Sequence, residues 1–167
     1  MTAPSVASLG GSIKKSPKVF ELRRRTVLPA AIDEVFRFFE SPKNLAAITP
    51  ASLRFRMLTP EPFEMKQNAV FDYVVRPFWL PMRWTTLITE YAPPRRFADV
   101  QTRGPYALWH HTHTFESVPG GTAMEDVVRY ALPWGFLGRL ALPLVRRQLN
   151  AIFDFREKAI ARIFLRS

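Results

Sequence analysis

The chain has 167 residues, of which 47% are hydrophobic, enough for one domain with a buried core. It contains no cysteine, which excludes a disulfide framework, a thiolate metal site and a cysteine nucleophile. Lysine and arginine outnumber aspartate and glutamate by 24 to 14, but these basic residues are scattered, which favours a solvated surface over a nucleic-acid footprint. No apolar run is long enough to span a bilayer and no signal peptide is visible, so we expect a soluble, cytoplasmic protein.

The first part of the chain predicts a tail, a strand and two short helices. Residues 1–17 are rich in small and polar residues, which is typical of a disordered tail, and residues 18–167 form the predicted domain. Residues 19–28 alternate as a strand. Residues 29–41 place Ile32, Val35, Phe36 and Phe39 on one face of a helix. We expect Ser41 to cap a second short helix that ends before Pro50.

The rest of the chain predicts an antiparallel meander followed by a long helix. Six strand-like runs are separated by turn signals: residues 52–58, 69–76, 82–91, 95–103, 107–118 and 123–132. An amphipathic helix follows over residues 136–166, where Pro143 predicts a kink or a short leading helix. The fold class is therefore α+β: a seven-stranded curved antiparallel sheet, two short helices and a long C-terminal helix across the concave face.

All three histidines of the chain lie in the stretch GPYALWHHTHTF, residues 104–115. Alternate side chains of a strand share a face, so His111 and His113 point one way with the large aromatic residues, whereas His110 points outward. The same rule assigns these residues to the concave face: Trp84, Thr86, Ile88, Glu90, Phe97, Asp99, Gln101, Trp109, Phe115, Met124, Asp126, Val128 and Tyr130.

The turns predict how these strands are paired. A three-residue loop at 104–106 places Asp99 opposite His111 and Phe97 opposite His113. At the next hairpin, a two-residue loop at 119–120 places His113 opposite Asp126, whereas a four-residue loop places Phe115 there; both keep Asp126 near His113. We therefore expect two carboxylate–imidazole pairs: His111 with Asp99, and His113 with Asp126.

A charged residue interrupts the apolar stripe of the predicted C-terminal helix. Arg156 lies on that stripe between Ile152 and Ala159. Its guanidinium either enters the cavity between helix and sheet, where it would contact a carboxylate, or reaches solvent from the edge of the stripe.

With these residues located, the sequence resembles the SRPBCC superfamily, the START-domain, birch-pollen-allergen and polyketide-cyclase-like helix-grip proteins, over residues 18–166. The phrases NLAAITP, RRFADVQTRGPYALWHHTHTF and QLNAIFDFR, the last after LPWGFLG, are similar to those of a bacterial branch whose ligand is unassigned. The resemblance implies a sheet that grips the terminal helix around a cavity for apolar or amphipathic molecules. Branches of the superfamily carry lipids, sterols or hormones, and others cyclise or dehydrate polyketides.

The leading functional hypothesis is binding or transport of a lipid-, isoprenoid- or polyketide-like small molecule, without a cofactor and without nucleic acid. The predicted ligand-binding residues are Tyr73, Trp84, Thr86, Phe97, Asp99, Gln101, Trp109, His111, His113, Asp126, Tyr130, Ile152 and Arg156.

Three alternatives stay open for the polar residues. The first is a cyclase or dehydratase-like lyase in which His111, His113, Asp99 and Asp126 supply an acid or base. The second is a core network without a ligand. The third is a metal site, since two histidines and a carboxylate match a known ligand set. We expect no metal, because separate aspartate partners would hold the two rings apart.

A hydrophobic loop tip suggests one further contact. The stretch RPFWLPMRW, residues 76–84, and the stretch LPWGFLG before the long helix gather aromatic and apolar residues beside arginines. Such a tip either folds back as ordinary core, covers the mouth of the cavity or makes a transient contact with an anionic membrane surface.

Overall fold

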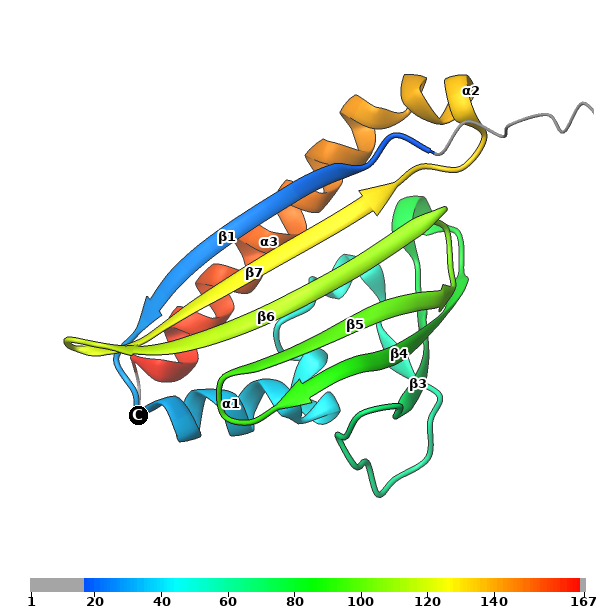
Figure 1. Cartoon of the computed structure of the whole chain (residues 1–167). Coiled ribbons are helices and arrows are strands. Elements are labelled where there is room, and N and C mark those ends of the chain that lie inside the picture. Colours follow the sequence, from blue (N-terminus) through cyan, green and yellow to red (C-terminus); the bar gives the residue numbers. More distant parts are fainter. Residues whose placement is uncertain (1–16, 166–167) are drawn as a thin grey trace, which may run out of the picture.

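The strands and helices follow one another in the predicted order over residues 17–165, which the computed structural model describes (Figure 1). Within these residues one seven-stranded antiparallel sheet has the strand order β1-β7-β6-β5-β4-β3-β2. The strands are β1 (Phe20–Leu28), β2 (Arg56–Met57), β3 (Val70–Val75), β4 (Met82–Ala92), β5 (Arg96–Arg103), β6 (Leu108–Val118) and β7 (Gly121–Ala131). The helices are α1 (Ile32–Glu40), α2 (Gly135–Leu140) and α3 (Leu142–Phe164), with short 3-10 turns at η1 (Pro42–Leu45), η2 (Ala51–Leu53) and η3 (Pro77–Trp79). The predicted α+β architecture is confirmed, whereas residues 1–16 of the predicted tail lie outside the described part.

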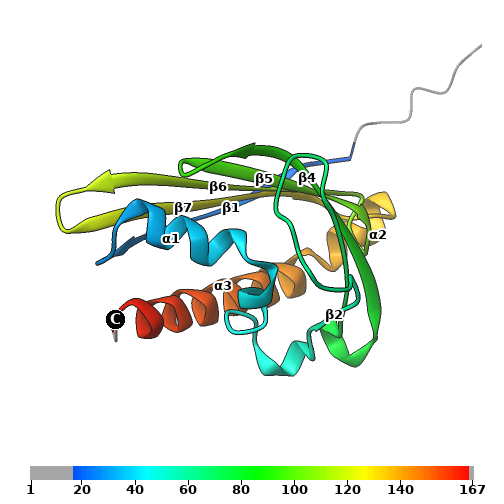
Figure 2. The same ribbon diagram turned by 90° about the horizontal axis from the view of Figure 1, so that it is seen from below.

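Helices α1 and α3 cover the same face of the sheet (Figure 2). The C-terminal half of α3 joins Phe36 of α1 in one buried cluster that also contains Phe97 and Phe115 of the sheet. The N-terminal half packs through Leu149 against a second cluster around β1 and β7. The polar residues of β5, β6 and β7 lie between these two apolar clusters, so the fold places them under the long helix.

The predicted strand register is confirmed. Asp99 pairs with His111, and His113 lies between Phe97 on one neighbouring strand and Asp126 on the other. The β6–β7 loop has two residues, because Val118 pairs with Gly121. Gly121 has a φ of +146°, and a Cβ atom there would lie 2.0 Å from the carbonyl oxygen of Leu28, so this tight turn requires glycine.

Two predicted elements are much shorter than expected. The run 52–58 contributes only the two residues of β2, because Arg54 adopts a left-handed conformation with a φ of +45° that interrupts an extended chain. The predicted helix 41–50 is a 3-10 turn, and Ser41 makes no side-chain cap. The hydroxyl of Thr49 instead donates to the carbonyl oxygen of Leu45, at 2.6 Å, and closes the segment locally.

A bulge in β4 corrects one face assignment. The pairing with β5 shifts between Ile88 and Glu90, which breaks the alternation of side chains. Glu90 is therefore half exposed and binds Arg96, at 2.8 Å, instead of facing the concave side. Tyr91 takes the inward position and contacts the ring of Phe36.

The C-terminal helical region is divided at Ala141, which separates α2 from α3. Helix α2 is thus the short leading helix, one of the two outcomes expected from Pro143. Pro143 lies in the first turn of α3, where its missing N–H removes no helical hydrogen bond. No helix in the described part is long and apolar enough to cross a membrane.

Candidate functional site

A cavity of about 430 Å³ lies between the concave face of the sheet and the helices. Its wall is mostly aromatic and aliphatic. Of the residues predicted to bind a ligand, those that line it are Tyr73, Trp84, Thr86, Phe97, Asp99, Trp109, His111, His113, Ile152 and Arg156. The arrangement gives an apolar hollow with one polar region.

Three predicted ligand-binding residues do not line the cavity. The side-chain amide of Gln101 donates to the carbonyl oxygen of Tyr106 at 2.8 Å and stabilises the β5–β6 loop. Tyr130 is 1% exposed and belongs to the apolar cluster under β7. Asp126 contacts the two imidazoles but does not line the cavity, so it would affect a bound ligand only through those two rings.

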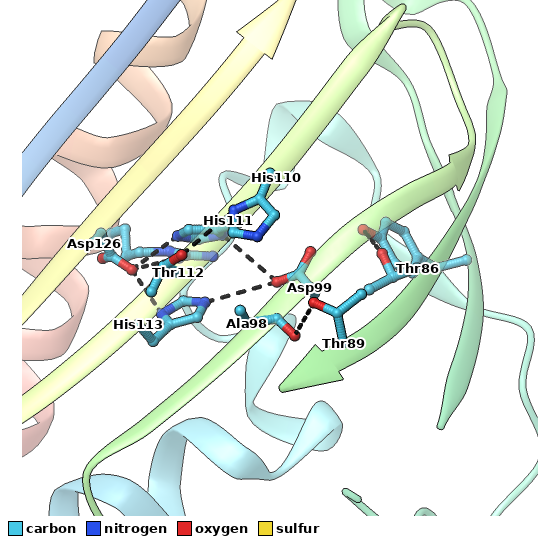
Figure 3. Close-up of polar contacts among 11 residues, drawn as sticks. Thr86, Thr89, Ala98, Asp99, His110, His111, Thr112, His113 and Asp126 are labelled. Carbon is cyan, nitrogen blue, oxygen red and sulfur yellow. Dashed lines mark hydrogen bonds and ion pairs between the residues drawn. The ribbon is translucent and has the colours of Figure 1, made fainter. Parts of the chain in front are cut away.

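The polar cluster consists of Asp99, His111, His113 and Asp126 (Figure 3), together with Arg156 of α3. Oδ1 of Asp126 accepts a hydrogen bond from Nε2 of His111 at 2.9 Å and lies 2.7 Å from Nδ1 of His113, though poorly aligned with that ring N–H. Oδ2 of Asp99 lies 3.9 Å from Nδ1 of His111 and 3.9 Å from Nε2 of His113, too far for hydrogen bonds. The expected separate pairs are thus replaced by one carboxylate that holds both rings and a second that faces them.

Aromatic side chains fix the orientation of the two imidazoles. The ring of His113 stacks on Phe97 with centroids 4.2 Å apart, and the ring of His111 meets Phe153 edge-on at 5.8 Å. Both histidines are nearly inaccessible to solvent, at 6% and 5% exposure. His110 lies on the other face of β6 as expected, and its Nδ1 lies 3.4 Å from the hydroxyl of Thr112.

Arg156 reaches the cluster from α3. Its side chain is 12% exposed, and Nη1 lies 3.9 Å from Oδ1 of Asp126. The guanidinium carbon lies 5.2 Å from the centroid of the Phe153 ring, which partly compensates the cation for its loss of water. Of the two positions expected for this side chain, the structure therefore shows the one that faces the cavity.

Burial and charge divide the protonation states of the cluster. Burial raises the pKa of Asp99 to about 6, although His111 and Arg156 act in the opposite direction. Burial would also raise the pKa of Asp126, but the two imidazoles outweigh it and hold this pKa far below its usual range. Burial lowers the pKa of both His111 and His113, so both rings are neutral at neutral pH.

Several buried N–H groups that border the cavity lack a partner. Within residues 17–165, Nε1 of Trp84 and both Nε and Nη1 of Arg156 make no hydrogen bond. Buried donors are nearly always satisfied, and leaving one unpaired costs about 1–3 kcal/mol. These groups therefore mark the place where the cavity favours a hydrogen-bond acceptor.

Several residues of the cavity wall are not predicted by the sequence pattern. The pattern places Tyr106 in a loop, yet the centroid of its ring lies 4.8 Å from that of Trp109 and 5.7 Å from that of Trp84. Phe39 and Phe153 also line the cavity, from α1 and α3. Phe39 carried a usable signal, since it belongs to the predicted apolar face of its helix, whereas a loop aromatic such as Tyr106 carries no periodic signal.

Comparisons with known proteins identify the fold. No protein-family model matches the sequence, and no curated protein matches it. Among solved structures, a Chromobacterium violaceum protein is 17% identical with a TM-score of 0.69, over 86% of this chain and 96% of that chain. The di-domain ARO/CYC StfQ from the steffimycin biosynthetic pathway is 14% identical with a TM-score of 0.67, over 89% of this chain and 52% of that one. A Thalictrum norcoclaurine synthase mutant is 12% identical with a TM-score of 0.67, over 92% and 98%. The chain therefore shares the helix-grip fold of these structures, as the sequence resemblance implies.

Proposed function

We propose that the protein binds and carries an apolar small molecule that ends in a hydrogen-bond-accepting group, such as a carbonyl or a carboxylate. The observation that carries this proposal is the set of unpartnered N–H groups of Arg156 and Trp84 in a mostly apolar wall. An acceptor bound there would satisfy them, and charge-assisted hydrogen bonds to a guanidinium are the stronger kind.

The dimensions of the cavity support a small-molecule ligand. Pockets that enclose such molecules typically measure about 300–1,000 Å³ and combine a mostly apolar wall with a few polar groups. The cavity of about 430 Å³ falls in this range. Its polar groups come from β4, β5, β6 and α3, so the ligand's polar end would lie beside them and its apolar body among the aromatic residues.

The entrance to the cavity suggests how an apolar ligand enters. Phe78 of η3, together with Trp134 and Leu137 beside and within α2, lines the cavity although these side chains are 44%, 81% and 67% exposed. Trp79 is 90% exposed beside them, and Arg139 is an exposed cation on α2. Residues Phe78–Leu80 and Trp134–Leu140 together form what we call the apolar mouth. We propose that this mouth makes a transient contact with an anionic membrane surface.

The test is a binding comparison with dodecanoic acid, its methyl ester and dodecane, measured by quenching of tryptophan fluorescence. The acid and the ester should bind more tightly than the alkane, and Arg156→Met should weaken the acid by about 10-fold or more. Arg147→Met, at an exposed position of α3, is the matched control and should leave binding unchanged. Equal affinity of Arg156→Met and the wild type for the acid would contradict the proposal.

A second candidate is acid–base catalysis by a cyclase or dehydratase-type lyase in the same cavity. Nδ1 of His111 and Nε2 of His113 face the Asp99 side of the cavity, and neutral imidazoles are suited to accept a proton. StfQ and norcoclaurine synthase share this fold. If the protein is an enzyme, His111→Ala should abolish turnover of its substrate while the substrate still binds; turnover that survives this change would exclude this role.

A further inference from the structure

The two histidines present one nitrogen each to the same side of the site. Asp126 lies against Nε2 of His111 and Nδ1 of His113, so the remaining nitrogens face Asp99. One ligand atom from each of Asp99, His111 and His113 lies within 4.8 Å of the others. From this geometry we propose that these three residues bind a divalent first-row transition-metal ion in the polar region of the cavity wall.

Asp126 prepares the two imidazoles for coordination. A neutral imidazole has one N–H and one lone pair, and an ionised carboxylate at one nitrogen holds the proton there. Asp126 therefore leaves the lone pairs of Nδ1 of His111 and Nε2 of His113 directed at Asp99. Histidine ligands of metals usually donate their second ring N–H to such a carboxylate, which fixes the ring and its tautomer. The sequence predicts no metal because two separate aspartate–histidine pairs would hold the two rings apart. In the structure both rings share Asp126, so that objection no longer applies.

The separations suit an ion after a small adjustment. Nitrogen and oxygen ligands lie about 2.1 Å from a zinc-like ion, which places neighbouring ligand atoms roughly 3–3.5 Å apart. Oδ2 of Asp99 is 3.9 Å from each free imidazole nitrogen, and all three ligand atoms lie within 4.8 Å of one another, so side-chain rotation would have to draw them together around the ion. Three protein ligands on one side leave open positions toward the cavity, as in the two-histidine, one-carboxylate ligand set.

The charges of the cluster also favour a cation. The carboxylates of Asp99 and Asp126 flank the two imidazoles. Arg156 supplies one guanidinium, with Nη1 3.9 Å from Oδ1 of Asp126. A divalent ion bound between Asp99 and the imidazoles would therefore have carboxylates on both sides of the imidazole pair.

The test is titration of the purified, tag-free and metal-free full chain with Co²⁺, followed by visible absorption, because protein-bound Co²⁺ has characteristic d–d bands. We expect saturation at one ion per chain. His113→Gln and Asp99→Asn should each weaken binding at least 10-fold, and Asp126→Asn should weaken it about 10–100-fold. His110→Gln alters the one histidine on the opposite face of β6 and should bind as the wild type does.

Two results would overturn the metal site: no saturable Co²⁺ binding by the wild type, or equal binding by His113→Gln and Asp99→Asn in variants whose circular dichroism shows a native fold. Loss of binding in His110→Gln alone would also overturn it, because that points to a surface ion. The comparison of dodecanoic acid, its ester and dodecane is made on metal-free protein. A negative result with Co²⁺ would therefore leave the proposed ligand binding intact, and a negative result with the fatty acid would leave the metal site intact.

Discussion

His111 and His113 lie two positions apart on β6, with ring centroids 3.9 Å apart. Two protonated imidazoles at this distance would repel each other, and His113 is one of the groups that lowers the pKa of His111. The pair therefore stays neutral beside an ionised Asp126, which makes this aspartate the anchor of the site.

Replacement of that anchor tests its structural role. Asp126→Asn removes the charge that holds two imidazole N–H groups and faces Arg156, so the free energy of unfolding should fall by about 2–4 kcal/mol. Urea denaturation measures it. Glu125→Gln on the same strand is the control; its partner Arg23 is 53% exposed, and such ion pairs contribute at most about 1 kcal/mol. Similar losses in the two variants would contradict the anchor role.

The raised pKa of Asp99 predicts a pH-dependent effect of Asp99→Asn. In the native state this carboxyl has a pKa of about 6, above its ordinary 3.8, so the native protein holds the proton more tightly than the unfolded chain. Stability contributed by this group is therefore lost as pH rises from about 4 to 6. Asparagine does not titrate, so the stability of the variant relative to the metal-free wild type should increase by about 2 kcal/mol between pH 4 and pH 7. Urea unfolding at several pH values measures this, and a difference that does not change with pH would refute it.

The apolar mouth predicts a salt-sensitive membrane contact. The double variant Trp79→Ser, Trp134→Ser removes two exposed rings and should reduce binding to vesicles of phosphatidylcholine and phosphatidylglycerol about 10-fold or more in a sedimentation assay. Added salt should also weaken vesicle binding by the wild type, because salt ions screen the attraction between its arginines and the anionic headgroups. Val27→Thr, at a half-exposed position of β1, should bind as the wild type does. Unchanged binding of the double variant would exclude this surface.

The glycines of the β6–β7 loop offer a matched pair of stability tests. Gly121→Ala should cost about 3 kcal/mol or more, because the new Cβ would collide with the backbone of Leu28. Gly120→Ala should cost only about 1–2 kcal/mol, since Gly120 has a φ of +87° but open space around its Cα. Thermal unfolding compares them. Equal costs would show that left-handed backbone conformation, rather than the close approach to β1, determines this turn.

Much of the fold was predictable because few physical rules determine it. Alternation along β6 and the lengths of the flanking loops together fix which residues of β5 and β7 face His111 and His113. The pattern of apolar residues likewise located α1 and the long terminal helix. The shape of the sheet followed from these elements.

The errors have a common physical origin, since each depends on backbone or side-chain torsions that residue patterns do not specify. The left-handed Arg54 shortens β2, and the bulge beside Glu90 turns that residue outward. Strand register predicts which Cα atoms are neighbours but not how rings rotate about their side-chain bonds. That is why the sharing of Asp126 by both histidines was not foreseen.

The position of Arg156 on α3 determines when the site becomes complete. Asp99, the imidazoles and Asp126 lie on β5, β6 and β7, which adjacent hairpins bring together without the rest of the chain. The guanidinium that lies 3.9 Å from Asp126 belongs to α3, which follows every strand in the sequence. The proposed ligand site is therefore complete only when α3 has packed on the sheet.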